Sequence, residues 1–354
     1  LGTRQAPEKT VTATEVMKKQ SVGSNSYMTE LEGTANTDRN IAMDDNYVYI
    51  AETQSSPVLW KIALADGPAS KMPVGTVDGG GTFALACPRI IPNTDPTINS
   101  GNSVLVVSSM GKDGENTFLY VYDKGINADP TKFSLNTAWM GRRIGDKFTF
   151  MAGTNGVTTL WMKDANSGAL LSFNLTMKDG SVSCTEATSR TYLIANWDEA
   201  GVGSIYFYPG VTSSVEGMYT STAKGSYVVR KDDVLTADNK PTYVAQWESK
   251  DLNKYAGCHG FQFFTLGGKH FIAYTKFSDK TLYVIKGASS ASGVKAALEA
   301  NEVVWSTAIN AATNGCTSGN SGADCAVRVI DENNVYVAGH IQNIGVVVYR
   351  LSVE

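Results

Sequence analysis

Two of the three histidines in this chain, His259 and His270, lie near Cys258 in the segment CHGFQFFTLGGKHFIAYTKF. Cysteine and histidine are common zinc ligands, so this spacing raises the question of a metal site. The Gly-Gly pair between the histidines is typical of a two-residue hairpin turn, which would place Thr265 opposite His270. The histidines would then lie about six residue steps apart along the hairpin, roughly 20 Å. We therefore expect two paired strands here and no metal or cofactor, because no C-x-x-C or histidine-rich spacing occurs elsewhere.

The hairpin is one copy of a pattern that recurs along the whole chain. In each copy an alternating apolar strand ends in a small residue, and an aliphatic-aromatic pair follows after a polar linker, its aromatic residue 9 to 12 positions after the small residue. The six copies are Ala51 with Leu59-Trp60, Ser108 with Leu119-Tyr120, Ala152 with Leu160-Trp161, Ala195 with Ile205-Tyr206, Ala273 with Leu282-Tyr283, and Ala338 with Val348-Tyr349. Six copies in register indicate a repeat architecture.

The repeat predicts an all-β fold, a β-propeller of six blades with four antiparallel strands each. Seven blades are the alternative, because residues 209–241 either form an insertion or hide another blade. The last copy stops after its third strand, so an N-terminal strand is expected to complete that blade and close the ring. We expect this strand at SYMTEL, residues 26–31, with 26–354 as one propeller domain and residues 1–25 as a partly loose segment.

The candidate ligand-binding residues lie where the channel through such a ring would open. Arginines lie near the starts of four predicted innermost strands, and His259 has the corresponding position in a fifth. A second group of candidate residues lies directly after the small residues that end the predicted second strands. The first group is Arg39, Arg89, Arg142, Arg143, Arg328 and His259; the second includes Glu52, Trp197 and His340. Converging arginines would suit a carboxylate, sulfate or phosphate. The alternative is local ion pairing, since Asp38 and Asp324 are close in sequence.

The acidic residues do not indicate a hydrolase active site. Propeller glycosidases use paired carboxylates on inner strands. Here the acids lie at the turn ends of the predicted inner strands, as Asp44, Asp45, Asp146, Asp331 and Glu332 do. Such residues commonly bond to the backbone of their own turn. The G-x-S-x-G nucleophile elbow is absent, and the sequence assigns no catalytic residue.

The five cysteines allow one disulfide hypothesis. Cys316 and Cys325 flank a loop rich in glycine and serine, CTSGNSGADC. A bridge would close this loop and would stabilise the fold by roughly 2 to 3 kcal/mol. The alternative is a pair of thiols near a loop. The other three cysteines lie in predicted strands and are expected to be buried.

Composition and charge exclude several classes of protein. Charged residues make up 18% of the chain and 34 of its 354 residues are glycine, which suits short strands joined by turns. The net charge of −4 argues against nucleic-acid binding. No apolar run reaches the roughly 18 residues needed to cross a bilayer, and LGTRQAPEKT is no signal peptide. We expect the protein to be a monomer. If it is exported, we expect its targeting segment to have been removed.

With these six repeats, low charge and turns rich in Gly, Ser and Asn, the chain resembles exported six-bladed β-propellers of Bacteroidetes, many of which look like lipid-anchored surface proteins. The resemblance implies a periplasmic, outer-membrane-anchored or extracellular location, and it carries no catalytic residues. The leading hypothesis is a non-catalytic binding or adhesion propeller that recognises a glycan or protein partner with one face. The alternative is a propeller-type carbohydrate hydrolase, lyase or lactonase with carboxylates at the channel mouth.

Overall fold

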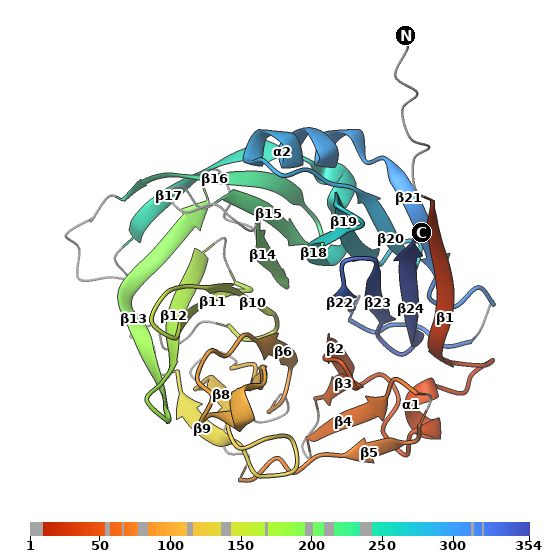
Figure 1. Cartoon of the computed structure of the whole chain (residues 1–354), viewed down its shortest axis with the longest axis horizontal. Coiled ribbons are helices and arrows are strands. Elements are labelled where there is room, and N and C mark those ends of the chain that lie inside the picture. The colour runs from red at the N-terminus through yellow and green to blue at the C-terminus, as the bar shows by residue number, and fades with distance from the viewer. Residues whose placement is uncertain are drawn as a thin grey trace.

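The computed structural model describes residues 10–53, 57–65, 67–76, 84–111, 116–135, 143–166, 169–194, 201–208, 216–233, 243–312, 315–320 and 322–354. Its strands form six four-stranded units arranged around a central axis (Figure 1). The protein is therefore a six-bladed β-propeller, as the repeat predicted. Among the described residues, no helix is long and apolar enough to span a membrane.

The first three blades each run from the axis outwards in chain order. Blade 1 contains β2 (Asp38–Met43), β3 (Tyr47–Glu52), β4 (Val58–Ala63) and β5 (Ala69–Lys71). Blade 2 contains β6 (Cys87–Ile91), β7 (Val104–Ser108), β8 (Phe118–Val121) and β9 (Thr131–Ser134), with the short helix η2 (Asn99–Gly101) before β7. Blade 3 contains β10 (Phe148–Ala152), β11 (Val157–Lys163), β12 (Ala169–Lys178) and β13 (Ser181–Ile194).

The other three blades complete the ring. Blade 4 contains β14 (Gly203–Phe207), β15 (Glu216–Ser221), β16 (Gly225–Asp233) and β17 (Tyr243–Asp251), followed by η3 (Asn253–Tyr255). Blade 5 contains β18 (Cys258–Leu266), β19 (Lys269–Lys276), β20 (Thr281–Lys286) and β21 (Val303–Ala308), with helix α2 (Ala291–Ala300) before β21. Blade 6 contains β22 (Ala323–Asp331), β23 (Asn334–Ile341), β24 (Gly345–Val353) and β1 (Val11–Gln20).

The N-terminal strand β1 closes the ring by pairing antiparallel with β24, from Val11 opposite Val353 to Gln20 opposite Gly345. Figure 1 shows the two strands side by side. The predicted closure is confirmed, but the predicted segment, residues 26–31, is wrong. That segment contains helix α1 (Tyr27–Glu30), because the Ser26 side chain accepts a hydrogen bond from the backbone N–H of Met28 and caps a helical turn. The propeller thus includes residues from Val11 onwards.

The repeat pattern matches the second and third strands in blades 1, 2, 5 and 6, but it is displaced in blades 3 and 4. The copy ending at Ala152 is the innermost strand β10, and Ile205-Tyr206 lie in the innermost strand β14. Residues 209–241 are not an insertion, because they include the whole of β15 and β16. The displacement arises because β10 also alternates apolar residues and ends in a small one, so it looks like a second strand. Ala195 lies outside the described residues.

Blades 3 and 4 are joined into one eight-stranded sheet. Their outermost strands, β13 and β17, pair in parallel, with Leu193 opposite Gln246 and Ile194 opposite Trp247. Figure 1 shows these two long strands beside each other at the outer wall of the ring. All the other strand pairs within the described part of the chain are antiparallel. The two blades are thus linked by backbone hydrogen bonds in addition to side-chain packing.

The hairpin with the two histidines has the predicted register. Thr265 lies opposite His270 and Leu266 opposite Lys269 in the β18–β19 pair. The Thr265 hydroxyl contacts His270 Nδ1 at 3.2 Å, and His270 is exposed. Among the described residues, no three His, Cys, Asp or Glu side chains are grouped so that they could hold a metal ion.

No disulfide joins Cys316 and Cys325, although both are buried in the core between blades 5 and 6. Cys325 lies within β22, opposite Gly339, so its position is set by strand pairing. The loop between the two cysteines is held by hydrogen bonds instead. Gln342 Oε1 accepts from the Ser318 hydroxyl at 3.1 Å and from the backbone N–H of Asn320 at 3.2 Å. The bridge hypothesis is therefore corrected.

Candidate functional site

The starts of the innermost strands meet at one end of the channel, which we call the upper face; the turns from innermost to second strands form the lower face. Seven polar side chains fill the channel near the upper face, and none is more than 8% exposed. This axial cluster consists of Arg39, Asn40, Arg89, Asp146, Lys147, His259 and Asp324. Its members come from five blades, so the cluster links strands that are far apart in sequence.

Arg89 and Asp324 form a buried ion pair between blades 2 and 6. Arg89 Nη1 lies 2.8 Å from Asp324 Oδ2, which also accepts from the backbone N–H of Ile41 at 3.1 Å. Arg89 Nε donates to the carbonyl oxygen of Phe148 at 2.9 Å. Burial by itself would raise the pKa of Asp324, but the cations of Arg89 and Lys147 lower it overall. Asp324 therefore stays ionised and has its charge compensated by an arginine.

Asp146 forms the second ionic node of the axial cluster. Its Oδ1 lies 2.9 Å from Arg39 Nη2 and 2.7 Å from Arg143 Nη2, and its Oδ2 accepts from Arg143 Nε at 3.0 Å. Two guanidinium groups thus share one carboxylate. The ion-pairing alternative describes these arginines. Arg143 pairs locally, three residues before Asp146, whereas Arg39 pairs with a carboxylate 107 residues away instead of with a neighbour in the sequence.

Arg328 does not belong to the axial cluster. The innermost strand of blade 6 starts at Ala323, so Arg328 lies further along it, towards the lower face. Its side chain is 33% exposed, and its Nε lies 2.6 Å from Oδ1 of Asp45. The residue that occupies the channel position in blade 6 is Asp324. Of the remaining candidates, Arg142 and Trp197 lie outside the described residues.

Glu52 is buried and serves as a local anchor. Its Oε2 accepts from Trp60 Nε1 at 2.8 Å, and its Oε1 accepts from the Thr37 hydroxyl at 2.9 Å and from the backbone N–H of Thr34. These bonds attach the segment after helix α1 to blade 1. With its oxygens occupied by protein donors, Glu52 is a structural residue.

His340 has a similar anchoring position between blades 6 and 1. Its Nε2 lies 2.6 Å from Asp38 Oδ2, and both side chains are fully buried. Asp38 also accepts from the hydroxyl of Tyr27 and from the backbone N–H of Asn343. These contacts fasten helix α1 where the ring closes.

His259 lies in the axial cluster, as its place in the sequence predicted. Gly260 follows it with φ +74°, and a Cβ there would lie 2.2 Å from the backbone N of Cys325. Only glycine fits both this backbone conformation and this approach. The strand is irregular between His259 and Gln262, and this irregularity places His259 against blade 6.

Lys147 and Asn40 were not predicted as members of this cluster. Lys147 Nζ donates to the carbonyl oxygen of Ala323 at 2.7 Å and to Asn40 Oδ1. Asn40 Nδ2 donates to the carbonyl oxygens of Ala86 and Asp146. The signal in the sequence is the position of Lys147 directly before β10, but the alternation of β10 predicts a second strand there and hides that signal.

We expect a pH dependence of stability from His259. Burial, reinforced by the Lys147 cation and partly opposed by Asp324, lowers the pKa of His259 to about 3. An unfolded histidine has a pKa of about 6.5. Between these values only the unfolded chain binds the proton, so the stability falls as the pH falls. We predict a loss of about 3 kcal/mol between pH 7 and pH 4 from this residue, measured by urea unfolding.

The substitution His259→Gln should remove that part of the pH dependence, because glutamine does not titrate. His270→Gln is the matched control, since His270 is exposed near the lower face, and its pH profile should follow that of the unsubstituted protein. An unchanged profile in His259→Gln would contradict the assignment. Of the charged members of the axial cluster, Arg39, Asp146 and Lys147 line the same cavity as the imidazole, and Lys147 and Asp324 shift its pKa.

An open pocket lies on the lower face between blades 2 and 3. Its volume is about 540 Å³, within the range of about 300–1,000 Å³ typical of small-molecule sites. The loop after β6 forms one wall, and the β10–β11 and β12–β13 turns form the other. We call it the blade 2/3 pocket; it is lined by Thr94, Asp95, Pro96, Thr97, Asn155, Gly156, Met177, Lys178, Asp179 and Gly180.

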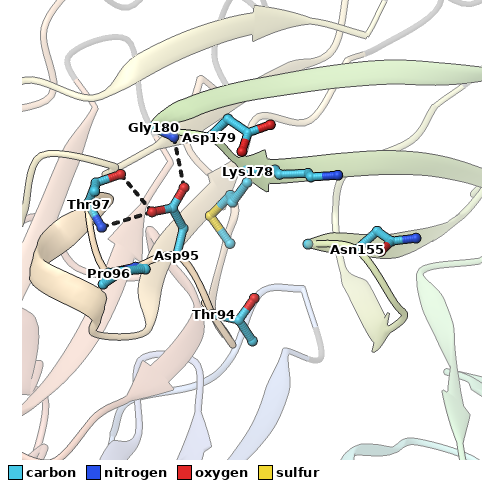
Figure 2. Close-up of a pocket in the computed structure, with 10 residues that line it drawn as sticks. Thr94, Asp95, Pro96, Thr97, Asn155, Lys178, Asp179 and Gly180 are labelled. Carbon is cyan, nitrogen blue, oxygen red and sulfur yellow. Dashed lines mark hydrogen bonds between the residues drawn. The ribbon is translucent and has the colours of Figure 1, made fainter.

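Asp95 fixes the two walls of this pocket to each other. Its Oδ1 accepts from the backbone N–H and the hydroxyl of Thr97 at 2.8 and 2.6 Å, and its Oδ2 accepts from the backbone N–H of Gly180 at 2.8 Å. These bonds, drawn as dashed lines in Figure 2, connect blade 2 to blade 3. The hydroxyl and the backbone donors lower the pKa of Asp95, so it is not suited to be a general acid.

The other polar side chains around the pocket are exposed and are available to a ligand. Figure 2 shows Asn155 and Lys178 on one side of the hollow and Pro96 and Thr97 on the other. Thr94, Asn155, Lys178 and Asp179 are all exposed. Together they offer hydrogen-bond donors and acceptors over a partly apolar base that contains Met177. Sequence reasoning did not find this pocket, because its residues come from three turns without any motif.

No protein-family model matches the sequence, and no curated protein sequence is significantly similar. Among solved structures, a DUF4623 family protein from Bacteroides eggerthii aligns with a TM-score of 0.60 and 14% identity, covering 90% of this chain and 71% of that chain. The allergen Mala s 1 of Malassezia sympodialis aligns with a TM-score of 0.48 and 10% identity, covering 90% and 92% of the two chains. A PQQ-bound aldose sugar dehydrogenase from Streptomyces coelicolor aligns with a TM-score of 0.49 and 9% identity, covering 99% and 100%. At 14% identity the likeness to the Bacteroides protein shows the fold alone.

Proposed function

We propose that this protein is a non-catalytic binding propeller of the cell envelope or cell surface that recognises a glycan through the blade 2/3 pocket. The observation that carries the proposal is the open hollow of about 540 Å³ whose walls are fixed by Asp95 and whose rim is polar. Sugar hydroxyl groups both donate and accept hydrogen bonds, and the side chains of Thr94, Asn155, Lys178 and Asp179 provide matching partners. A pocket that is already formed loses little entropy on binding.

The hydrolase alternative has less support. In the axial cluster, Asp146 and Asp324 are each bound to arginine, so neither is free to act as an acid or a nucleophile. In the blade 2/3 pocket, Asp95 has its oxygens occupied and its pKa lowered, whereas glycoside hydrolysis needs a general acid of raised pKa. The acidic residues described in the axial cluster and in the blade 2/3 pocket therefore favour a binding function over a catalytic one.

The envelope location rests on the resemblance to exported propellers of Bacteroidetes, and the Bacteroides neighbour in the structural comparison agrees with it in fold. Accessibility of the protein to an added protease on intact cells tests this part. Cleavage on intact cells is the expected result, and full protection until lysis would contradict it.

The binding proposal is tested by screening purified protein on a glycan array and against insoluble polysaccharides, followed by calorimetric titration of the glycans retained. We expect a dissociation constant of roughly 0.1–1 mM for a small glycan, because the described lining lacks aromatic rings. Asn155→Ala combined with Lys178→Ala should weaken binding at least about tenfold, which corresponds to the loss of one or two hydrogen bonds.

Lys295→Ala is the matched control for this titration, because Lys295 lies on helix α2 at the outside of blade 5 and pairs with Glu299. It should bind as the unsubstituted protein does. Equal binding by the pocket double variant would exclude the pocket. Release of shortened sugars during incubation would contradict a non-catalytic function.

A further inference from the structure

Lys147 is a buried cation that forms no ion pair within 4 Å among the described residues, although the more distant carboxylate of Asp324 raises its pKa. Its side chain is 3% exposed, and its ammonium donates to two neutral oxygens, the carbonyl of Ala323 and the side-chain amide of Asn40. The nearby carboxylate of Asp146 is already shared by Arg39 and Arg143. Buried charges in proteins are normally paired, because an uncompensated charge has a desolvation cost of several kcal/mol.

A small cavity lies beside this ammonium group. It has a volume of about 20 Å³, which exceeds the roughly 10–15 Å³ that one water molecule requires. Its lining includes Arg39, Asn40, Lys147 and His259, with Asp146 as its only described acidic side chain. His259 is 1% exposed, and its Nδ1 has no hydrogen-bond partner. The cavity is thus bordered by two cations and by an imidazole whose Nδ1 has no hydrogen-bond partner.

We propose that this cavity binds one monovalent inorganic anion of the size of chloride. The ammonium of Lys147 holds the anion, and the imidazole of His259 and the guanidinium of Arg39 border it. A water molecule would fill the same volume but would add no negative charge to a cluster in which three cations, Arg39, Arg89 and Lys147, face two carboxylates. A metal cation is disfavoured by the two cationic side chains, and the volume is too small for phosphate or sulfate.

The lowered pKa values of Lys147 and His259 agree with this site. Burial is the main cause for both groups. Neighbouring cations lower both pKa values further, and the carboxylate of Asp324 partly opposes the shift in each case. A bound anion would offset both effects, so the pH dependence expected of His259 is that of the anion-free protein. The site would also explain why arginine and lysine side chains are grouped in the channel near the upper face. The anion would act as a common counter-ion for cationic side chains from several blades.

The first experiment compares thermal unfolding in sodium chloride, sodium bromide and sodium gluconate at equal ionic strength. Chloride and bromide should raise the melting temperature above its value in gluconate by roughly 2 °C when the halide is at about ten times its dissociation constant. Lys147→Met should abolish the difference, and His259→Asn should reduce it. Arg328→Gln, at an exposed ion pair towards the lower face, should retain it.

The deciding experiment is anomalous diffraction from crystals grown with bromide as the only halide. We expect a bromide peak within hydrogen-bonding distance of Lys147 Nζ and no peak there in Lys147→Met. Absence of an anomalous peak from the cavity overturns the proposal whatever the melting temperatures, as do bromide peaks confined to the molecular surface. The outcome is independent of glycan binding, because the blade 2/3 pocket lies on the opposite face and shares no residue with the cavity.

Discussion

Replacing Asp324 with alanine is expected to lower the free energy of unfolding by about 3–5 kcal/mol. The substitution leaves the guanidinium of Arg89 buried without its counter-charge, since Arg89 is 7% exposed and Asp324 is its only described carboxylate partner within 4 Å. It also removes the acceptor for the backbone N–H of Ile41. Equilibrium unfolding in urea, followed by tryptophan fluorescence and circular dichroism, measures the change.

Two further variants separate the cost of an unpaired charge from the value of the pair itself. Arg89→Met combined with Asp324→Leu should recover much of the lost stability, because replacing a buried ion pair with apolar groups is often neutral. Arg328→Gln breaks the exposed pair with Asp45 and should change stability by less than about 1 kcal/mol. A loss below 1 kcal/mol in Asp324→Ala would show that the channel is more hydrated than the buried geometry implies.

The fold could be predicted because a six-bladed propeller repeats the same four-stranded unit, with a similar sequence pattern, six times. Small residues such as Ala51, Ala273 and Ala338 are fully buried in second strands, and Trp60 of the third strand of blade 1 fills space between blades. The register of the β18–β19 hairpin followed from a single Gly-Gly turn. Such features are local, so the sequence carries them directly. In blades 3 and 4 the sequence pattern was assigned to the wrong strands of the blade. Two neighbouring strands can show the same apolar alternation, so the pattern alone does not tell them apart.

The channel could be predicted only in part, because its partners are set by the closed ring and not by sequence spacing. His259, Arg39 and Arg89 were expected at the upper face and lie there. Their acidic partners could not be inferred, since Arg39 pairs with Asp146, which is 107 residues away, and Arg89 with Asp324, which is 235 residues away. The blade 2/3 pocket was missed for a similar reason, since it depends on how two blades pack.

Removing residues 1–20 is expected to cost at least about 5 kcal/mol of unfolding free energy, the sum of a lost strand and its buried side chains. Without β1, strand β24 becomes an unpaired edge along its whole length, from Gly345 to Val353. Met17, which is 1% exposed and packs in the core between blades 6 and 1, is lost as well. We expect the shortened chain to self-associate, because a long exposed edge strand pairs readily with another chain. Size-exclusion chromatography and thermal unfolding measure both effects.

A synthetic peptide with the sequence VTATEVMKKQ tests whether the effect comes from strand pairing. Added to the shortened chain, it should restore the monomer and raise the melting temperature in a concentration-dependent manner, because only the folded propeller binds it. A peptide of the same composition in scrambled order should not, since the register places Met17 opposite Val348. A shortened chain that is monomeric and as stable as the full one would mean that blade 6 holds together with three strands. Rescue by the peptide would instead show that ring closure depends on this one non-local pairing, which joins the two ends of the chain.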